Sequence, residues 1–377
     1  MQNLILVLFI IYILSLLFEN IEANKNRRRI ENVIYVNGTR GKSSVTRLID
    51  AGLRASGKKV FCKTTGTLPM MIDTENCEKL IKRSGRANIK EQLMVLKQAA
   101  KESADILVAE CMAVSPVLQH ISQHKMMKSN IGIITNVRLD HTEEMGHSLS
   151  EICDSLCATI PKNGVVFTCE ARLFDRIEAA AQAVGSKAVL VKKEDAIADS
   201  VDFPENVSLA LAVCDYLGVQ KSVALKRMAG YKRDPYALSL HALSNGALFI
   251  NGLSINDPQS SKIVFQNVIK KITPVPRNLI LLINNRPDRG YRTDHMLLLA
   301  NALKPQHIWL IGASKQVMKR RLQSADFHPE IVLFDSVDRL PFSSLDKNNM
   351  IFAVGNIAND GHMLMQRIRK EATPYVL

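Results

Sequence analysis

The chain has 377 residues, 47% of them hydrophobic, which is typical of packed globular proteins and excludes a disordered chain. A net charge of +13 favours a polyanionic neighbour such as anionic lipid or an acidic polymer, while only 5% aromatic residues argue against a nucleic-acid partner. The seven cysteines form no Cys-x-x-Cys pair, which argues against a disulfide scaffold or a zinc ribbon and indicates an intracellular body.

The amino terminus carries an apolar run, Leu4–Phe18, in which Ser15 is the one polar residue. Together with its neighbours this run approaches the length of about 20 residues that a membrane span needs. A basic cluster, 25–29, follows the run, whereas a cleavable signal peptide carries its positive charges in front. By the positive-inside tendency we expect residues 1–24 to be a single membrane anchor with the body in the cytoplasm. The alternative is a buried core helix, which would need a large hydrophobic shell.

Downstream of the anchor, short apolar runs alternate with amphipathic segments. This alternation is typical of βαβ units with a buried, mostly parallel sheet, so the fold class is α/β. Glycine, charges and proline cluster near 230–235 and predict a boundary between two domains, 25–235 and 236–377. The predicted strands are Val33–Val36, Ile106–Ala109, Ile131–Thr135, Val165–Thr168, Ala188–Val191, Leu248–Asn251, Leu279–Ile283, Ile308–Ile311, Ile331–Phe334 and Ile351–Val354; the amphipathic segments include Ser44–Ala55, Ile89–Glu102 and Leu149–Thr159.

The first predicted strand runs into a glycine-containing turn that a helix follows. Its two glycines let the backbone fold tightly and present N–H groups to a phosphate at the amino terminus of the helix. Lys42 can reach the β- and γ-phosphates, and the Ser43 hydroxyl suits Mg²⁺. The usual P-loop has four residues between its glycines, and this one has two. We expect a nucleotide phosphate to bind to Gly38, Thr39, Arg40, Gly41, Lys42, Ser43 and Ser44.

Further polar residues follow the next two predicted strands. Glu110 ends one strand, and Asn136 and Asp140-His141 follow the other. Ligands of open parallel sheets bind beyond the carboxyl ends of the strands, and a carboxylate beside a triphosphate is a natural partner of Mg²⁺. We therefore predict that Glu110 is a metal ligand. His141 is a less expected ligand for a hard cation, and taken alone it is more often structural.

These features together resemble the Mur ligase family of ATP-dependent amide ligases. From about 33 to 357 the sequence is more closely similar to the ligase subunit of poly-γ-glutamate (capsule) synthases. The motifs that carry this resemblance are Lys63-Thr64-Thr65-Gly66-Thr67, Ala87-Asn88-Ile89-Lys90-Glu91-Gln92, Glu110-Cys111-Met112-Ala113-Val114, Ala158-Thr159-Ile160-Pro161-Lys162-Asn163-Gly164, Asn251-Gly252 with Asn256-Asp257, Asn284-Asn285-Arg286-Pro287-Asp288-Arg289, and Gly355-Asn356-Ile357.

The resemblance implies a P-loop ATPase domain followed by a smaller Rossmann-like domain, with ATP and Mg²⁺ or Mn²⁺ as cofactors. It implies that Lys42 and the loop hold the phosphates, that Ser43 and Glu110 hold one cation, and that His141 with Glu110 holds a second. In the second domain it implies that Asn256 and Asp257 contact the nucleotide, that Asp288 contacts ribose, and that Arg286 or Arg289 contacts the transferred phosphoryl group.

One departure from the family lies in the region after His141. Many Mur ligases carry a carbamylated lysine there, but this chain has Cys157-Ala158-Thr159, and Lys162 comes several residues late. The way in which a second cation is held is therefore expected to differ from that in the family.

We expect a membrane-anchored ligase that activates a terminal carboxylate as an acyl phosphate and adds glutamate to poly-γ-glutamate. Its expected partners are glutamate, the polymer, anionic lipid, other membrane subunits of a synthase and a second copy of the chain, and no nucleic acid. Two alternatives stay open at this point. One is a folylpolyglutamate-type or cell-wall ligase, against which the anchor argues. The other is a P-loop ATPase that energises polymer export without forming amides.

Overall fold

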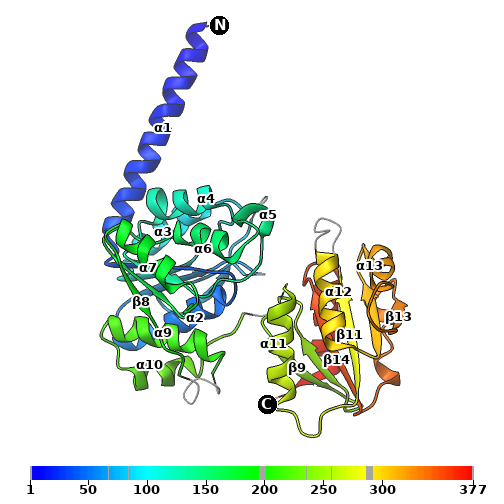
Figure 1. The fold of residues 1–377 in the computed structure, drawn as a ribbon. Helices are drawn as coiled ribbons and strands as arrows, with labels where there is room; N and C mark the ends of the chain where they lie inside the picture. Colours follow the sequence, from blue (N-terminus) through cyan, green and yellow to red (C-terminus); the bar gives the residue numbers. More distant parts are fainter. Residues whose placement is uncertain are drawn as a thin grey trace. The chain divides into compact units, whose positions relative to one another are not determined.

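The computed structural model describes residues 2–66, 68–83, 85, 87–194, 201–234, 236–255, 257–285 and 292–375. The chain divides into two compact units, 1–234 and 235–377, each built around its own sheet (Figure 1). The predicted residues Asn256, Arg286, Asp288 and Arg289 lie outside the described residues.

The first unit begins with the long helix α1 (Gln2–Arg28), which projects from the body (Figure 1). Its residues Asn3–Arg28 are long and apolar enough to cross a membrane, and no part of the apolar window is buried inside the protein. Side chains such as Phe9 and Phe18 are more than half exposed. No other described part of the chain covers this apolar surface.

The sheet of the first unit has eight strands in the order β4-β3-β2-β5-β1-β6-β7-β8. The six strands from β2 to β8 in this order pair in parallel, and the short β3 and β4 are antiparallel additions at one edge. The bounds are β1 (Asn32–Asn37), β2 (Val60–Thr64), β3 (Met70–Ile72), β4 (Glu78–Leu80), β5 (Ile106–Glu110), β6 (Ile131–Ile134), β7 (Val165–Thr168) and β8 (Lys187–Leu190).

Helices cover both faces of this sheet because its central strands are apolar on both sides. Alternate residues of β1 illustrate this: Ile34 and Val36 pack in one core with α2 and α9, while Val33 and Tyr35 pack in another with α3. The helical segments are α2 (Lys42–Leu53), η1 (Arg54–Ser56), α3 (Glu91–Lys101), α4 (Pro116–Ile121), the π-helix η2 (Ser122–Met127), α5 (Thr142–Met145), α6 (Leu149–Cys157), α7 (Phe174–Ala183), α9 (Pro204–Tyr216) and α10 (Lys221–Met228).

The second unit has a seven-stranded sheet in the order β13-β12-β11-β14-β10-β9-β15. The strands from β13 to β10 pair in parallel, and β9 and β15 are antiparallel. Its elements are β9 (Ser239–Leu243), β10 (Leu248–Asn251), α11 (Pro258–Ile269), β11 (Asn278–Asn284), α12 (Arg292–Leu303), β12 (His307–Ile311), α13 (Lys315–Leu322), β13 (Glu330–Leu333), η3 (Val337–Arg339), η4 (Phe342–Ser344), β14 (Asn349–Gly355), α14 (Asp360–Glu371) and β15 (Ala372–Pro374).

Candidate active site

A tight turn joins the centre of the first sheet to helix α2. The buried strand β1 ends at Asn37, and α2 begins at Lys42. Gly38 and Gly41 lie between these two elements and have φ angles of 130° and 80°, which residues other than glycine rarely adopt. A Cβ atom at Gly38 would lie only 2.0 Å from the Thr135 hydroxyl oxygen. Both glycines are therefore required for the loop to turn at this point.

Residues that follow β6 hold the turn in place. The Asn136 carbonyl accepts hydrogen bonds from Thr39 N (3.0 Å), and its side-chain amide bonds both to Arg40 N (3.1 Å) and to Arg40 O (3.0 Å). The Thr135 hydroxyl donates to the same Arg40 carbonyl at 2.6 Å. The sequence predicts Asn136 at this edge of the sheet, and in the structure Asn136 fixes the conformation of the loop.

Lys42 folds back across the turn. Its Nζ donates a hydrogen bond of 2.7 Å to Gly38 O and approaches Thr39 O at 3.4 Å. The side chain is half-buried, so the ammonium lies against the loop backbone. A flexible cation at this position can exchange loop carbonyls for the oxygens of a phosphate, which is how the lysine of a P-loop acts.

Ser43 and Glu110 meet beside the loop. Val36 and Glu110 are partners in the pairing of β1 with β5, which brings the carboxyl end of β5 next to the start of the loop. The Ser43 hydroxyl donates a hydrogen bond of 2.9 Å to Glu110 Oε2, and Thr65 N donates one of 2.7 Å to the same oxygen. Glu110 is only 3% exposed.

The donors around Glu110 fit a hard cation. A buried carboxylate and a serine hydroxyl are oxygen ligands of the kind that Mg²⁺ and Mn²⁺ accept. The Thr65 hydroxyl beside them is buried and has no hydrogen-bond partner among the described residues, so a further oxygen is available there. Ser43, Glu110 and Thr65 could therefore hold a divalent cation at the end of the phosphate loop.

A fully buried lysine, Lys63, lies on β2 close to this carboxylate. Its Nζ forms an ion pair of 3.0 Å with Glu91 at the start of α3. Glu91 also pairs with Arg83 at 2.6 Å. Burial lowers the pKa of Lys63, and the Glu91 carboxylate opposes that shift. Lys63 belongs to one of the family-like motifs, but no role for it could be predicted, because nothing in the sequence of a strand indicates that its lysine is buried.

His141 lies in the loop after β6, where its backbone is left-handed with φ of 50°. Its ring approaches Asp140 at 3.7 Å and Glu144 at 3.8 Å, and Asp140 forms an ion pair of 3.0 Å with Arg40. Among the described residues, no group of three or more His, Cys, Asp or Glu side chains is arranged to hold a metal. The structure thus brings Ser43 and Glu110 together and gives His141 other carboxylate neighbours.

The amino end of α9 supports the loop from another side. The Asn206 side chain approaches Gly41 so closely that a Cβ there would lie 2.6 Å from its oxygen. Asp202 accepts a hydrogen bond from Asn206 (2.9 Å) and another from the Tyr231 hydroxyl. Tyr231 in turn lies against the Ser44 hydroxyl, and burial raises its pKa. The sequence gave no signal for these contacts, which join segments about 160 to 190 residues apart.

In the second unit, Asp257 is buried and caps helix α11. Its carboxylate accepts a hydrogen bond of 2.7 Å from Ser260 N, as an N-cap residue does. A pocket of about 270 Å³ opens at the carboxyl ends of β11, β12 and β14. Its lining includes Asn284, Gly312, Lys315 and Asp360. Ligands of parallel sheets bind at this edge.

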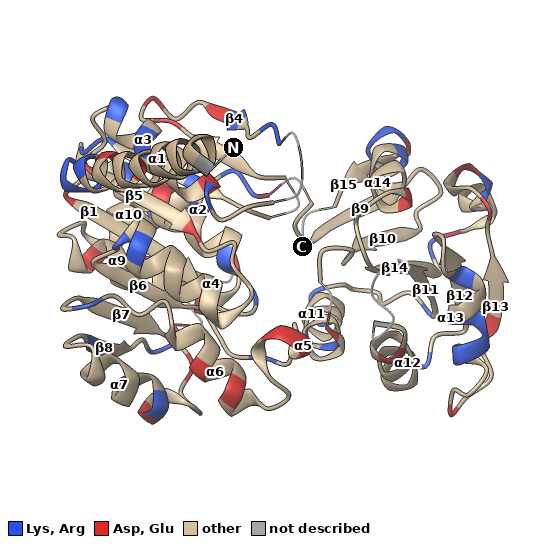
Figure 2. Ribbon diagram, turned by 90° about the horizontal axis from the view of Figure 1, so that it is seen from above, with Lys and Arg blue, Asp and Glu red and all other residues tan. Residues whose placement is uncertain are grey.

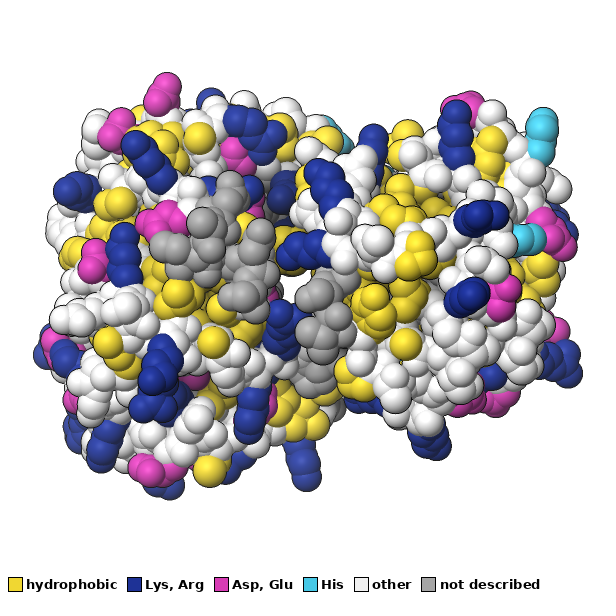
Figure 3. Space-filling model, turned by 90° about the horizontal axis from the view of Figure 1, so that it is seen from below, with side chains coloured by type: hydrophobic (Ala, Val, Ile, Leu, Met, Phe, Trp, Pro, Cys, Tyr) yellow, Lys and Arg dark blue, Asp and Glu magenta, His cyan; other side chains and the backbone are white. Residues whose placement is uncertain are grey.

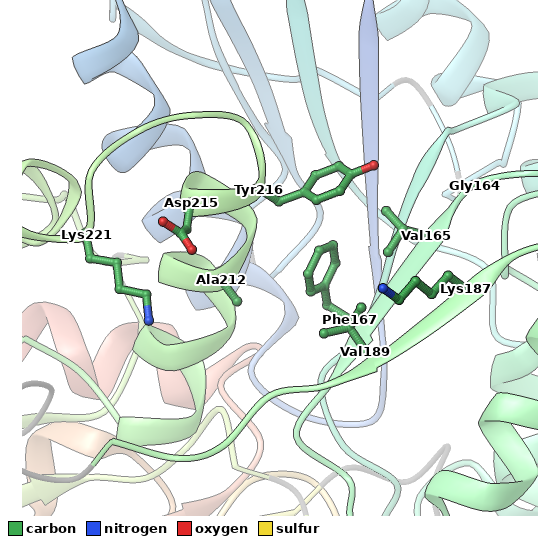
Figure 4. Close-up of a pocket in the computed structure, with 9 residues that line it drawn as sticks. All are labelled: Gly164, Val165, Phe167, Lys187, Val189, Ala212, Asp215, Tyr216 and Lys221. Carbon is green, nitrogen blue, oxygen red and sulfur yellow. The ribbon is translucent and has the colours of Figure 1, made fainter.

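A larger pocket, of about 360 Å³, lies elsewhere on the first unit between β7, β8 and α9 (Figure 4). The Phe167 and Tyr216 rings meet edge to face in it at 5.5 Å. Lys187 begins β8, and Gly164 precedes β7, so the pocket is at the amino ends of these strands. The predicted site residues follow the carboxyl ends of parallel strands, and none of them lines this pocket.

The first unit has a parallel sheet with a glycine-containing turn, a lysine at the start of the following helix and a buried carboxylate beside the turn. These features are typical of a P-loop protein of the Mur ligase type. The Mur ligase middle domain matches residues 36–210, and the poly-gamma-glutamate synthase CapB C-terminal domain matches residues 239–371. The fold is similar to that of a bifunctional folylpolyglutamate synthase/dihydrofolate synthase solved with Mn, AMPPNP and L-glutamate. The TM-score is 0.67 at 14% identity, over 93% of each chain.

Two curated relatives are similar over nearly the whole chain. The capsule biosynthesis protein CapB of Bacillus anthracis is 31% identical, covering 98% of this chain and 84% of its own length. The PGA synthase CapB of Bacillus subtilis (strain 168) is 32% identical, covering 93% of this chain and 94% of its own length. The chain belongs to the CapB family of Mur ligase-like proteins.

Proposed function

We propose that this protein is an ATP-dependent amide ligase that adds glutamate to poly-γ-glutamate in capsule synthesis. The observation that carries the proposal is the Ser43–Glu110 pair beside the phosphate loop, in a chain that matches CapB relatives over both units. The relatives are named for capsule and PGA synthesis, and the folylpolyglutamate synthase with the similar fold was solved with L-glutamate.

The chemistry follows from the poor electrophilicity of a carboxylate. A carboxylate oxygen of the acceptor attacks the γ-phosphorus of ATP, ADP leaves, and an acyl phosphate forms. The amine of glutamate then attacks the acyl carbon, and phosphate leaves with the carboxylate oxygen while the amine loses its proton. Both steps depend on positioning and on neutralising charge. The backbone of residues 39–44 and the Lys42 ammonium are proposed to hold the transferred phosphoryl group.

Ser43 and Glu110 are proposed to hold one divalent cation, and His141 with Glu110 a second. Held by these residues, a divalent cation would supply neutralisation of the phosphate charge. Thr65 positions Glu110 through its N–H, and Asn136 positions the loop. These residues keep the phosphate-binding groups in place before ATP arrives.

Residues 25–235 are proposed to form the ATPase domain, and residues 236–377 the ligase domain. There Asn256 and Asp257 are proposed to contact the nucleotide, with Asp288 on the ribose. Arg286 or Arg289 would then contact the phosphoryl group.

Residues 1–24 are proposed to anchor the protein in the cell membrane, with the body in the cytoplasm. The exposed apolar surface of α1 supports this, as does the basic cluster 25–29 that follows the apolar run. Anionic lipid, other membrane subunits of the synthase and a second copy of the chain are proposed as partners.

The test is phosphate release from ATP by detergent-solubilised protein, with and without glutamate and a short γ-linked glutamate oligomer, followed by mass analysis of the products. The proposal predicts stimulated release and oligomers longer by one glutamate. ATP turnover that is indifferent to both substrates, in detergent and in membranes with the other subunits, would instead support a role in energising export.

A further inference from the structure

We propose that three lysines of the first unit form a collar around α1 that binds the headgroups of an anionic lipid leaflet. They are Lys90 at the N-cap of α3, Lys97 on α3 and Lys128 at the end of η2. This inference rests on the proposed membrane anchor and goes beyond it, because the lysines belong to the folded body and not to the anchoring segment. We call these three residues the lysine collar.

Helix α1 is continuous with the folded body. Asn26 and Ile30 are buried, and Ile30 belongs to the core that β1 and α3 share. Arg27 donates hydrogen bonds to the carbonyls of Lys128 (2.8 Å) and Ile30 (2.7 Å), which closes the end of the helix. The body is therefore attached to α1 by packing, and the same surface of the body always surrounds the end of the helix.

Each collar lysine contacts α1 just past its apolar run. Lys90 forms an ion pair of 3.0 Å with Glu19, and Lys97 forms one of 2.8 Å with Glu22. Lys128 donates a hydrogen bond to Asn24. Figure 2 looks onto the unit from the side of α1 and shows α3, which carries Lys97, lying beside it.

The position of these contacts along α1 places the lysines at headgroup depth. Glu19 directly follows the apolar run that ends at Phe18, and Asn24 is five residues further on. At 1.5 Å per residue these contacts span about 7.5 Å. The headgroup layer on each side of a bilayer is about 5–7 Å thick, which matches this span. If α1 crosses the bilayer, the collar is level with lipid phosphates.

The charge balance around the end of α1 is positive. Glu19 and Glu22 are the acidic residues of α1, whereas the collar and the helix end supply the cations Lys90, Lys97, Lys128, Lys25, Arg27, Arg28 and Arg29. More than half of the Lys90 and Lys97 side chains is exposed although each has an ion-pair partner. Their ammonium groups can donate to a lipid phosphate while keeping the carboxylate partner, since an ammonium has three donors.

The experiment measures lysine reactivity in the full chain reconstituted into nanodiscs. A water-soluble acetylating reagent is applied in discs of phosphatidylcholine alone and in discs that also contain phosphatidylglycerol, and each lysine is quantified by mass spectrometry. We expect acetylation of the collar lysines to fall about fivefold per residue in the anionic discs, and to recover in high salt. Lys226 on α10 is the control, and its reactivity stays equal in the two discs.

Matched variants separate charge from structure. Exchange of the collar (Lys90→Gln, Lys97→Gln and Lys128→Gln) lowers the enrichment of phosphatidylglycerol around the protein in mixed discs, and the basic residues at the end of α1 retain the rest. Exchange of Lys187, Lys221 and Lys226 for glutamine removes the same charge and leaves the enrichment of phosphatidylglycerol unchanged. These three are exposed and lie on β8 and α10, and Figure 3 shows that basic side chains occur on the face away from α1 as well.

Equal acetylation of the collar in neutral and anionic discs overturns the inference, and so does unchanged lipid enrichment after the collar exchange. Failure of the anchor itself is recognised separately, because the chain then fails to enter phosphatidylcholine discs at all. Failure of the proposed ligase activity is recognised in the assay of glutamate products. The results of the acetylation and lipid-enrichment experiments do not depend on that assay.

Discussion

The hydroxyl of Ser43 donates a hydrogen bond of 2.9 Å to Oε2 of Glu110, although 67 residues separate the two. The contact exists because β1 and β5 are neighbours in a parallel sheet and both side chains emerge at its carboxyl edge. The parallel sheet therefore brings a candidate phosphate-binding loop and a candidate metal ligand together at one edge, although they are far apart in the sequence.

Exchange of Lys42 for alanine removes the cation from the loop. Its hydrogen bonds reach only the Gly38 and Thr39 carbonyls, so the fold should be kept. We expect ATP turnover to fall about 10²–10³-fold, the usual loss of one group that stabilises transition-state charge. Steady-state kinetics measures this, and an unchanged thermal midpoint shows that the variant is folded. Normal turnover would place the active site elsewhere.

Glu110→Gln keeps the shape of the side chain and an oxygen for Thr65 N, but removes the charge that a cation needs. We expect the apparent affinity for Mg²⁺ to fall at least about tenfold, since even outer-shell groups of metal sites contribute that much. Titration of ATP turnover with Mg²⁺ measures it. The control is Glu330→Gln, an exposed carboxylate on β13 of the second unit. Equal Mg²⁺ curves for Glu110→Gln and the parent chain would remove Glu110 from the metal site.

Lys63→Met tests the buried ion pair on β2. The change leaves Glu91 with Arg83 alone and removes a cation from a fully buried position. Breaking a buried pair typically costs about 3–5 kcal/mol, so we expect a large drop in the free energy of unfolding. The control is Lys58→Met, which breaks an exposed pair with Glu31 and should leave the denaturation midpoint unchanged. Similar midpoints for the two variants would mean that the Lys63 pair is not structurally important.

His124 gives the protein a predicted sensitivity to acid. Burial on the π-helix η2, together with the positive neighbours His120 and Lys162, lowers the pKa of His124 to about 4. The unfolded chain binds this proton at about pH 6.5, so the folded state is favoured above pH 6.5 and loses stability as the pH falls toward 4. We expect thermal midpoints to fall over this range, and to fall less in His124→Gln. A parallel loss in both proteins would assign the acid sensitivity to other groups.

Much of the fold could be predicted from the sequence because most strands are buried on both faces and appear as apolar runs. The bounds of Val165–Thr168 and Leu248–Asn251 agree with β7 and β10. Strand β2 was missed because Lys63 and Thr64 interrupt its apolar run, and the burial of that lysine depends on Glu91. The antiparallel strands β3, β4, β9 and β15 were missed for a related reason, since they are short or half-buried.

The loop and Glu110 could be predicted because both follow directly from the order of strand, turn and helix. Thr65, Asn206 and Tyr231 could not, because their contacts with Glu110, Gly41 and Ser44 depend on how distant segments pack. The expected pairing of His141 with Glu110 stays a prediction. It depends on a cation that would draw both side chains toward itself.

The most direct test of the central claim follows one oxygen atom. A γ-linked glutamate oligomer labelled with ¹⁸O in its carboxyl groups is incubated with the protein, ATP, Mg²⁺ and glutamate, and the released phosphate is examined by mass spectrometry. Activation of the carboxylate as an acyl phosphate predicts that one ¹⁸O passes into phosphate for each amide bond formed. Phosphate that carries only oxygen from ATP and water, at full ATP turnover, would contradict the account and leave an ATPase that makes no amide.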